Sequence, residues 1–161
     1  MLRRQLLTTL VGTDSARPDS NSSAVACPAK LKAKRPVHIL VAEDIRVNQK
    51  VVQRMLESRG CRVDLVANGA EAVAATQDRQ YALVLMDCQM PELDGLDATA
   101  AIRRRDAGSG RYLPIVALTA DVTEGARQRC LDAGMDGYLS KPLRPRELEA
   151  ALLRWLPDSF S

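Results

Sequence analysis

Aromatic residues are scarce in this sequence, which holds one Trp, one Phe and three Tyr among 161 residues. Proteins that bind single-stranded nucleic acids stack the bases on exposed aromatic rings, so this scarcity argues against such a surface. The net charge of +3 is unevenly spread. Residues 1–36 carry seven Lys and Arg against two Asp, whereas residues 37–161 carry sixteen against eighteen Asp and Glu. Because the body of the chain is slightly acidic, we expect no nucleic-acid partner.

Paired cysteines and long apolar runs are also missing. The four cysteines form no Cys-x-x-Cys motif, so we expect reduced thiols and a cytoplasmic protein. A transmembrane helix needs about 20 consecutive apolar residues, and no stretch of the sequence approaches this length. The short apolar run after Arg4 contains two threonines and precedes no clear cleavage site. We therefore expect no membrane contact by this segment.

The first 36 residues differ in composition from the rest. They are rich in Ser, Pro, Ala and Lys and show no apolar periodicity, which indicates a flexible basic linker or tail over residues 1–36. From Val37 onward, strand-like apolar runs alternate with helix-like segments. We expect one domain over residues 37–157, long enough for a hydrophobic core, and a short C-terminal tail at 158–161.

Five strand–helix units follow one another in this domain. Continuous apolar strands that alternate with helices are typical of a parallel sheet covered on both faces, and right-handed crossovers leave few ways to connect them. We therefore predict an α/β fold, a flavodoxin-like (βα)5 three-layer sandwich with a five-stranded parallel sheet of order 2-1-3-4-5. The strands are expected at 37–42, 61–67, 81–86, 113–119 and 137–140, and the helices at 46–59, 69–79, 95–105, 122–131 and 145–156.

Several of these helices carry end signals. Asn68 and Glu71 have the spacing of a capping box before the second helix. Asp121 is placed to cap the fourth helix, and Gly134 is placed to stop it. Pro145 suits the first turn of the last helix.

The carboxyl ends of the expected strands carry a distinct set of polar residues. Binding sites in open parallel α/β sheets form beyond these ends, so we expect the residues that follow the strands to share one pocket. Each residue alone has an ordinary explanation, because acidic residues and threonines often cap helices. A site is favoured because all of them fall at one edge of one sheet: Glu43, Asp44, Asp87, Thr119, Ala120, Lys141 and Pro142.

Three carboxylates in one pocket repel one another, and raised pKa values or a bound cation must offset this repulsion. Oxygen ligands suit Mg²⁺, which takes one or two carboxylates together with water and phosphate oxygens. A lysine supplies positive charge to a phosphoryl group, and a threonine hydroxyl can follow that group. The set permits attack by an aspartate on phosphorus to give an acyl phosphate, stabilised by the metal and the lysine.

Four motifs span the ends of expected strands: "LVAED" (40–44), "LVLMDCQMPELDG" (83–95), "VALTA" (116–120) and "GYLSKPL" (137–143). In order and spacing they resemble the motifs of the response-regulator receiver domains of two-component signalling, and the resemblance covers residues 37–156. The sequence around the first two motifs is most similar to receivers attached to hybrid sensor histidine kinases. The resemblance implies the same flavodoxin-like fold and a role in a phosphorelay.

The resemblance also implies a phosphoacceptor and a metal site. Asp87 is expected to receive the phosphoryl group. Glu43 and Asp44 are the expected acidic pair for Mg²⁺, with Mn²⁺ as a substitute, and Asp44 is the expected direct ligand. Asp87 and the backbone carbonyl of Gln89 would complete the protein ligands.

The remaining motif residues are expected to bind the phosphoryl group or to report it. Thr119, Lys141 and the backbone N–H of Ala120 would contact its oxygens. Tyr138 would be the switch aromatic, which turns inward as Thr119 moves toward the phosphoryl group. Pro142 would follow a cis peptide bond. Phosphorylation would change the surface of the fourth and fifth strand–helix units.

The resemblance implies that the partner is a histidine kinase or a histidine phosphotransfer domain, with weak homodimerisation as a further expectation. The isolated domain would not be an enzyme, although it would assist its own phosphorylation and dephosphorylation. The parent chain would be a hybrid histidine kinase, of which this segment is a cytoplasmic part. A stand-alone single-domain response regulator is the alternative.

Three other functions fit the residues less well. An aspartate-nucleophile phosphatase needs a second acidic residue two positions after the nucleophile, where this chain has Gln89, and a cap over the substrate. A receiver used only for binding commonly lacks one of the acidic residues or the lysine of the site. This chain has all five side chains of the site: Glu43, Asp44, Asp87, Thr119 and Lys141. A nucleotide-binding flavodoxin-like protein needs a glycine-rich loop after the first strand, where this chain has the acidic "AEDIRVN".

Overall fold

The computed structural model describes residues 31–160, in which five β-strands form one parallel sheet. The strands lie in the order β3-β2-β4-β5-β6, so the second strand along the chain is at one edge, beside the first. This is the predicted order 2-1-3-4-5, and the flavodoxin-like fold class is confirmed. The strands are β2 (Val37–Ala42), β3 (Cys61–Val66), β4 (Leu83–Asp87), β5 (Ile115–Thr119) and β6 (Gly137–Ser140).

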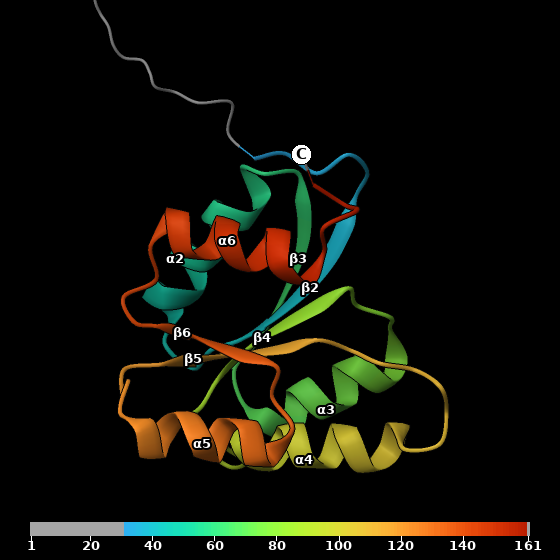
Figure 1. Ribbon diagram of the computed structural model, residues 1–161, viewed down its shortest axis with the longest axis vertical. Coiled ribbons are helices and arrows are strands. Elements are labelled where there is room, and N and C mark those ends of the chain that lie inside the picture. The colour runs from blue at the N-terminus through green and yellow to red at the C-terminus, as the bar shows by residue number, and fades with distance from the viewer. Residues whose placement is uncertain (1–30, 161) are drawn as a thin grey trace, which may run out of the picture. The chain divides into compact units, whose positions relative to one another are not determined.

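Five helices in the described region cover both faces of the sheet (Figure 1). Helices α2 and α6 lie on one face, and α3, α4 and α5 lie on the other, which completes the three-layer sandwich. No helix among these five is both long enough and apolar enough to cross a membrane. Their bounds are α2 (Arg46–Glu57), α3 (Gly69–Asp78), α4 (Gly95–Asp106), α5 (Glu124–Ala133) and α6 (Pro145–Trp155).

The core lies on both sides of the buried strands. Leu40 and Met86 are fully buried in a cluster that includes Ile102 of α4. Ile39 and Val41, also fully buried, point to the opposite face because side chains alternate along a strand. A strand covered on both faces must be apolar throughout, and this is why the runs in the sequence are continuous rather than alternating.

Helix α5 begins later than the sequence predicted. Its N-cap is Thr123, whose Oγ1 accepts a hydrogen bond from the N–H of Ala126 at 3.3 Å. The prediction that Asp121 caps this helix was wrong, because its carboxylate accepts the N–H of Thr123 at 2.9 Å in the turn before the helix. The helix stops at Gly134 as predicted, where φ of 104° places the backbone in the left-handed region that glycine tolerates.

Residues on both sides of the expected domain boundaries, 37 and 157, also belong to the packed unit. The N–H of Ala33 donates to the carbonyl of Arg59 at 2.7 Å, and the N–H of Lys34 donates to the carbonyl of Ser159 at 2.8 Å. Phe160 is 2% exposed and forms an antiparallel bridge with Ala33. Most of the predicted linker and the last residue lie outside the described residues.

Candidate functional site

The carboxyl ends of β2, β4, β5 and β6 meet at one edge of the sheet and border a cleft of about 870 Å³. Asp44, Asp87, Thr119 and Lys141 line this cleft, and each comes from the end of a different strand. Glu43 directly precedes Asp44 in the chain and is 1% exposed. The structure thus brings together the residues that the sequence placed at one edge.

Asp87 is the last residue of β4, and its surroundings hold it in place. All five residues of the strand are buried, and Asp87 itself is 3% exposed. The chain returns past it at the start of α4, where a Cβ on Gly95 would lie 2.2 Å from the Asp87 carbonyl oxygen. Glycine at this position is therefore what allows the close approach. The N–H of Gln89 donates to Asp87 Oδ1 at 3.0 Å and orients the carboxylate.

Lys141 contacts two carboxylates. Its Nζ lies 2.7 Å from Asp87 Oδ2 and 2.9 Å from Glu43 Oε2. Burial alone would lower the pKa of this ammonium group, but its hydrogen bonds and charge interactions with Asp87 and Glu43 outweigh burial and raise the pKa. The lysine therefore stays charged at physiological pH and presents a fixed positive charge beside Asp87. The peptide bond between Lys141 and Pro142 is cis, as expected.

A third carboxylate, that of Asp44, lies close to the two that Lys141 contacts. Carboxylate oxygens of Glu43, Asp44 and Asp87 lie within 4.8 Å of one another. Glu43 Oε1 accepts the backbone N–H of Ile45 at 3.1 Å, whereas the buried Glu43 Oε2 has the Lys141 ammonium group, 2.9 Å away, as its ion-pair partner. A single ammonium group leaves this cluster with excess negative charge. Such a set of oxygen donors fits a hard divalent cation such as Mg²⁺.

The hydroxyl of Thr119 is held by the loop that follows β5. Its Oγ1 donates to the carbonyl of Asp121 at 3.1 Å and accepts the N–H of Asp121 at 3.0 Å. Ala120 lies between them in the chain, is exposed and also lines the cleft. If the Thr119 hydroxyl turned toward a group on Asp87, it would have to exchange these partners for new ones.

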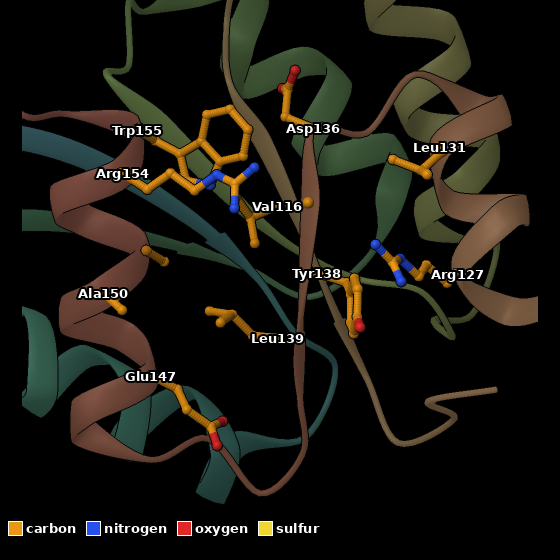
Figure 2. A pocket seen from close by; sticks show the side chains of 12 residues that line it. Val116, Arg127, Leu131, Asp136, Tyr138, Leu139, Glu147, Ala150, Arg154 and Trp155 are labelled. Carbon is orange, nitrogen blue, oxygen red and sulfur yellow. The ribbon is translucent and has the colours of Figure 1, made fainter. Parts of the chain in front are cut away.

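Tyr138 lies outside the cleft. It is paired in register with Ala117 of β5 and is 36% exposed. Its side chain lines a separate groove between α5 and α6, where Figure 2 shows it beside Arg127. The sequence located this residue on the last strand, and the structure adds that its ring points outward.

Sequence reasoning missed other residues of the cleft. Asp94 and Arg129 both line it. Asp94 caps α4, its Oδ1 accepting the N–H of Asp97 at 2.9 Å, and the spacing of the two aspartates is the signal that would have found it. Outside the cleft, the side-chain amide of Gln49 donates to the Glu43 carbonyl at 2.6 Å and so restrains the backbone at Glu43 and Asp44. No pattern in the sequence indicated this contact.

Two cysteines border the same cleft. Cys88 Sγ lies 3.5 Å from Cys130 Sγ, and both residues line the cleft wall. Burial, and then the neighbouring Cys130, raise the pKa of the Cys88 thiol to about 12, so it stays protonated. Cys61, Cys88 and Cys130 are free thiols, whereas Cys27 lies outside the described residues. This agrees with the expectation of reduced cysteines that serve in packing.

The sequence is similar to known receiver domains. The family model of the response regulator receiver domain matches residues 39–153. The sensor protein GacS of Pseudomonas syringae pv. syringae is 43% identical over 122 residues, which cover 75% of this chain and 14% of that protein. Curated relatives of this kind are much longer, and the chain spans between 4% and 16% of their length.

Solved structures agree in fold. The receiver domain of a sensor histidine kinase from Pseudomonas aeruginosa PAO1, solved with a magnesium ion coordinated in the active-site cleft, is 47% identical with a TM-score of 0.70, over 76% of this chain and 98% of that chain. A co-crystal of the Saccharomyces cerevisiae histidine phosphotransfer protein Ypd1 with the receiver domain of Ssk1 matches at 30% identity and a TM-score of 0.70, over 75% of this chain and 89% of that chain. With the family model covering most of the described residues, this chain belongs to the response regulator receiver domain family.

Proposed function

We propose that the chain is the phosphoacceptor receiver of a two-component phosphorelay and that Asp87 takes the phosphoryl group. The observation that carries this proposal lies at the end of β4. The buried Asp87 carboxylate is 2.7 Å from Lys141 Nζ and shares an oxygen cluster with Glu43 and Asp44. Buried charge is costly unless it is compensated, so three carboxylates around one lysine support a chemical role rather than a structural one.

In the proposed reaction, a carboxylate oxygen of Asp87 attacks the phosphorus of a phosphohistidine. A P–O bond forms, the P–N bond breaks, and its electron pair stays on the imidazole nitrogen of the donor. Lys141 neutralises negative charge that accumulates on the phosphoryl oxygens. The backbone N–H of Ala120 and the hydroxyl of Thr119 then bind the oxygens of the transferred group.

The acidic cluster would hold Mg²⁺, or Mn²⁺ in its place. The proposed ligands are the carboxylates of Asp44 and Asp87 and the backbone carbonyl of Gln89, with Glu43 completing the acidic pair. Bound there, the metal supplies charge neutralisation between the carboxylates and the incoming phosphoryl oxygens. Carboxylate oxygens of three residues within 4.8 Å of one another, with one lysine beside two of them, support this arrangement.

Thr119 and Tyr138 would convert phosphorylation into a change of surface. A phosphoryl group adds about −1.5 to −2 charges and new acceptor oxygens. These oxygens offer the Thr119 hydroxyl an alternative to Asp121, and its movement frees space for the Tyr138 ring. The changed surface would include helices α5 and α6.

An exposed apolar patch beside the cleft supports docking of the phosphoryl donor. Ile45, just before α2, and Val47 and Val51 in the first half of α2 are exposed, and Ile45 lines the cleft itself. Exposed apolar side chains gathered in one place mark interaction sites. A helix of a histidine kinase or histidine phosphotransfer domain, seated on this patch, would present its phosphohistidine to Asp87.

The parent protein proposed for this segment is a hybrid sensor histidine kinase in the cytoplasm, with a single-domain response regulator as the alternative. Similarity to receiver regions of long histidine kinases supports the first. The receiver itself would act on no substrate other than its own phosphoryl group, and any homodimer would be weak. Gln89, in the place where a phosphatase needs a second aspartate, supports this assignment over the phosphatase alternative.

Incubation of the protein with acetyl phosphate and Mg²⁺ tests the proposal. Intact mass should rise by the mass of one phosphoryl unit, about 80 Da, and peptide mapping should locate it on Asp87. Asp87→Asn should abolish the adduct, whereas the control Asp132→Asn, on the exposed side of α5, should retain it. An adduct that persists in Asp87→Asn would refute the assignment.

A further inference from the structure

A second hollow, of about 420 Å³, lies over β6 between helices α5 and α6 (Figure 2). We call it the α5–α6 groove. Val116 and Leu139 lie along its strands, and side chains of the two helices form its walls. Tyr138 lies on the α5 side of this groove and not in the cleft of Asp87. The groove therefore contains the ring whose direction the proposed switch would change.

Arg127 contacts this ring from α5. Its guanidinium carbon lies 5.5 Å from the centroid of the Tyr138 ring, and the two side chains face each other in Figure 2. A cation within about 6 Å of the face of an aromatic ring is attracted by its quadrupole. Arg127 forms no ion pair within residues 31–160, whereas Arg129 of the same helix lies 3.9 Å from Asp121. The ring is thus the electrostatic partner that the described structure gives Arg127.

The other half of the proposed switch is also held away from Asp87. Thr119 exchanges two hydrogen bonds with the backbone of Asp121. Each of the two switch side chains therefore has its own restraint, one in the β5–α5 loop and one on the surface of α5. Release of both is required before Thr119 can bind a phosphoryl group and Tyr138 can turn inward.

We propose that Arg127 is a positioning residue that holds the Tyr138 ring outward and so opposes the phosphorylation switch, an inference that rests on the proposed function of Asp87. A contact made in only one of two conformations shifts their populations by the energy of that contact. An exposed cation–π contact is worth a factor of about two to five in such an equilibrium. Loss of Arg127 should move the population toward the inward ring by this factor.

The opposite wall of the groove supplies a matched control. Arg154 of α6 stacks over Trp155 with its guanidinium carbon 5.1 Å from the ring centroid, and it too is exposed. Arg154→Ala removes the same charge and the same kind of contact from the same groove but leaves Arg127 and Tyr138 untouched. Arg127→Lys retains the cation and is the conservative variant that should restore part of the effect.

Fluorine NMR of the full chain labelled with 3-fluorotyrosine reads the ring directly. The sequence has three tyrosines, and the signal lost in Tyr138→Phe identifies Tyr138. Its solvent exposure is measured by the shift between H₂O and D₂O, without and with Mg²⁺ and beryllium fluoride as the phosphoryl mimic. The affinity for beryllium fluoride is measured in the same titration.

Arg127→Ala should make the Tyr138 fluorine less exposed to solvent without the mimic and should raise the affinity for beryllium fluoride about two- to fivefold. Arg127→Lys should show a smaller change, and Arg154→Ala should match the wild type. A Tyr138 signal and an affinity that are unchanged in Arg127→Ala would overturn the proposal. Failure of the proposed function is seen separately, as wild-type protein that takes up no phosphoryl group at Asp87.

Discussion

Asp64 and Asp87 are both aspartates on parallel strands, and their surroundings are opposite. Asp64 of β3 accepts the hydroxyl of Tyr81 at 2.6 Å and also lies 3.1 Å from His38 Nε2 and 3.6 Å from Arg79. The Tyr81 hydrogen bond, despite partial burial, holds the pKa of Asp64 below its usual value. Asp87 shares a single ammonium group with another buried carboxylate. One carboxylate is surrounded by donors, and the other is surrounded by more negative charge than its neighbours neutralise.

This difference is the one expected between a structural carboxylate, Asp64, and the proposed phosphoacceptor, Asp87. Every donor around Asp64 stabilises its ionised form, so removal of a donor costs folding stability. Around Asp87 the repulsion among the carboxylates remains in the folded state, and binding of a cation would relieve it. Removal of one acidic residue from that cluster should therefore preserve stability and abolish ligand binding.

Lys141→Met should have the largest effect on stability. The substitution leaves buried Glu43 and Asp87 facing each other without a cation, and breaking a buried ion pair in this way costs about 3 kcal/mol of unfolding free energy at pH 7. Urea unfolding at pH 7 measures this loss. Arg129→Met, at an exposed pair, should change stability by less than about 1 kcal/mol. Equal losses in the two variants would contradict the contrast.

Asp44→Ala should weaken Mg²⁺ binding by at least about 100-fold, the upper end of the loss seen when a group that only supports a metal ligand is removed, because Asp44 is a proposed direct ligand. Acetyl phosphate should no longer label Asp87. The unfolding free energy without Mg²⁺ should stay the same or rise, since repulsion in the cluster falls. Isothermal titration with Mg²⁺ and urea unfolding without it give the two quantities. Asp132→Ala serves as the exposed control. A normal rate of labelling in Asp44→Ala would show that this carboxylate is no ligand.

Sequence reasoning located the edge of the sheet because the strands are apolar on both faces and end abruptly in polar residues. Asp87 and Lys141 stand out for that reason. The direction of the Tyr138 ring could not be predicted, because it depends on a contact with another element, α5. The burial of Phe160 was missed for a related reason. It pairs with Ala33, more than a hundred residues earlier, and no local pattern reports such a contact.

The first residue of α5 was also wrongly predicted, because its position depends on a contact outside the helix. Asp121 and Thr123 are both good N-cap residues, and the sequence alone does not choose between them. The choice follows from Thr119, whose hydroxyl binds both the N–H and the carbonyl of Asp121 and keeps that residue in a turn. A residue of the proposed switch thus determines where α5 begins, a dependence that local propensity does not contain.

Thr119→Ala should separate phosphorylation from switching. The variant keeps Asp87, the acidic pair and Lys141, so acetyl phosphate should still label Asp87. It lacks the hydroxyl that would link the phosphoryl group to the ring, and the coupling lost should be about 1–3 kcal/mol. Amide spectra with and without beryllium fluoride measure this loss as smaller shifts over residues 122–156. Thr123→Ala, which removes a hydroxyl nearby, should retain the wild-type shifts. A full response in Thr119→Ala would refute the proposed coupling.

Tyr81→Phe should have the smallest effect and should act on the structural carboxylate alone. Deleting one hydrogen bond to a half-exposed ionised group should cost about 1 kcal/mol of unfolding free energy at pH 7. Tyr138→Phe is the control, because its hydroxyl forms no hydrogen bond within residues 31–160. Mg²⁺ binding and labelling of Asp87 should be normal in Tyr81→Phe. A loss of either would mean that the two carboxylates are not independent.

The stabilisation by the hydrogen bond between Tyr81 and Asp64 should depend on pH, because both groups have shifted pKa values. The folded-state pKa of Asp64 is lowered, so its contribution is present above the unfolded value of about 3.9 and disappears as pH falls through the folded value. Burial and the bond to Asp64 raise the pKa of Tyr81 to about 12, so the hydroxyl contribution is present below the unfolded value of about 10 and disappears as pH rises toward 12. The difference between wild type and Tyr81→Phe should therefore be constant from about pH 5 to 9 and should shrink on both sides. A difference that persists at pH 2 would mean that the stabilisation comes from packing of the ring edge and not from the ionised Asp64.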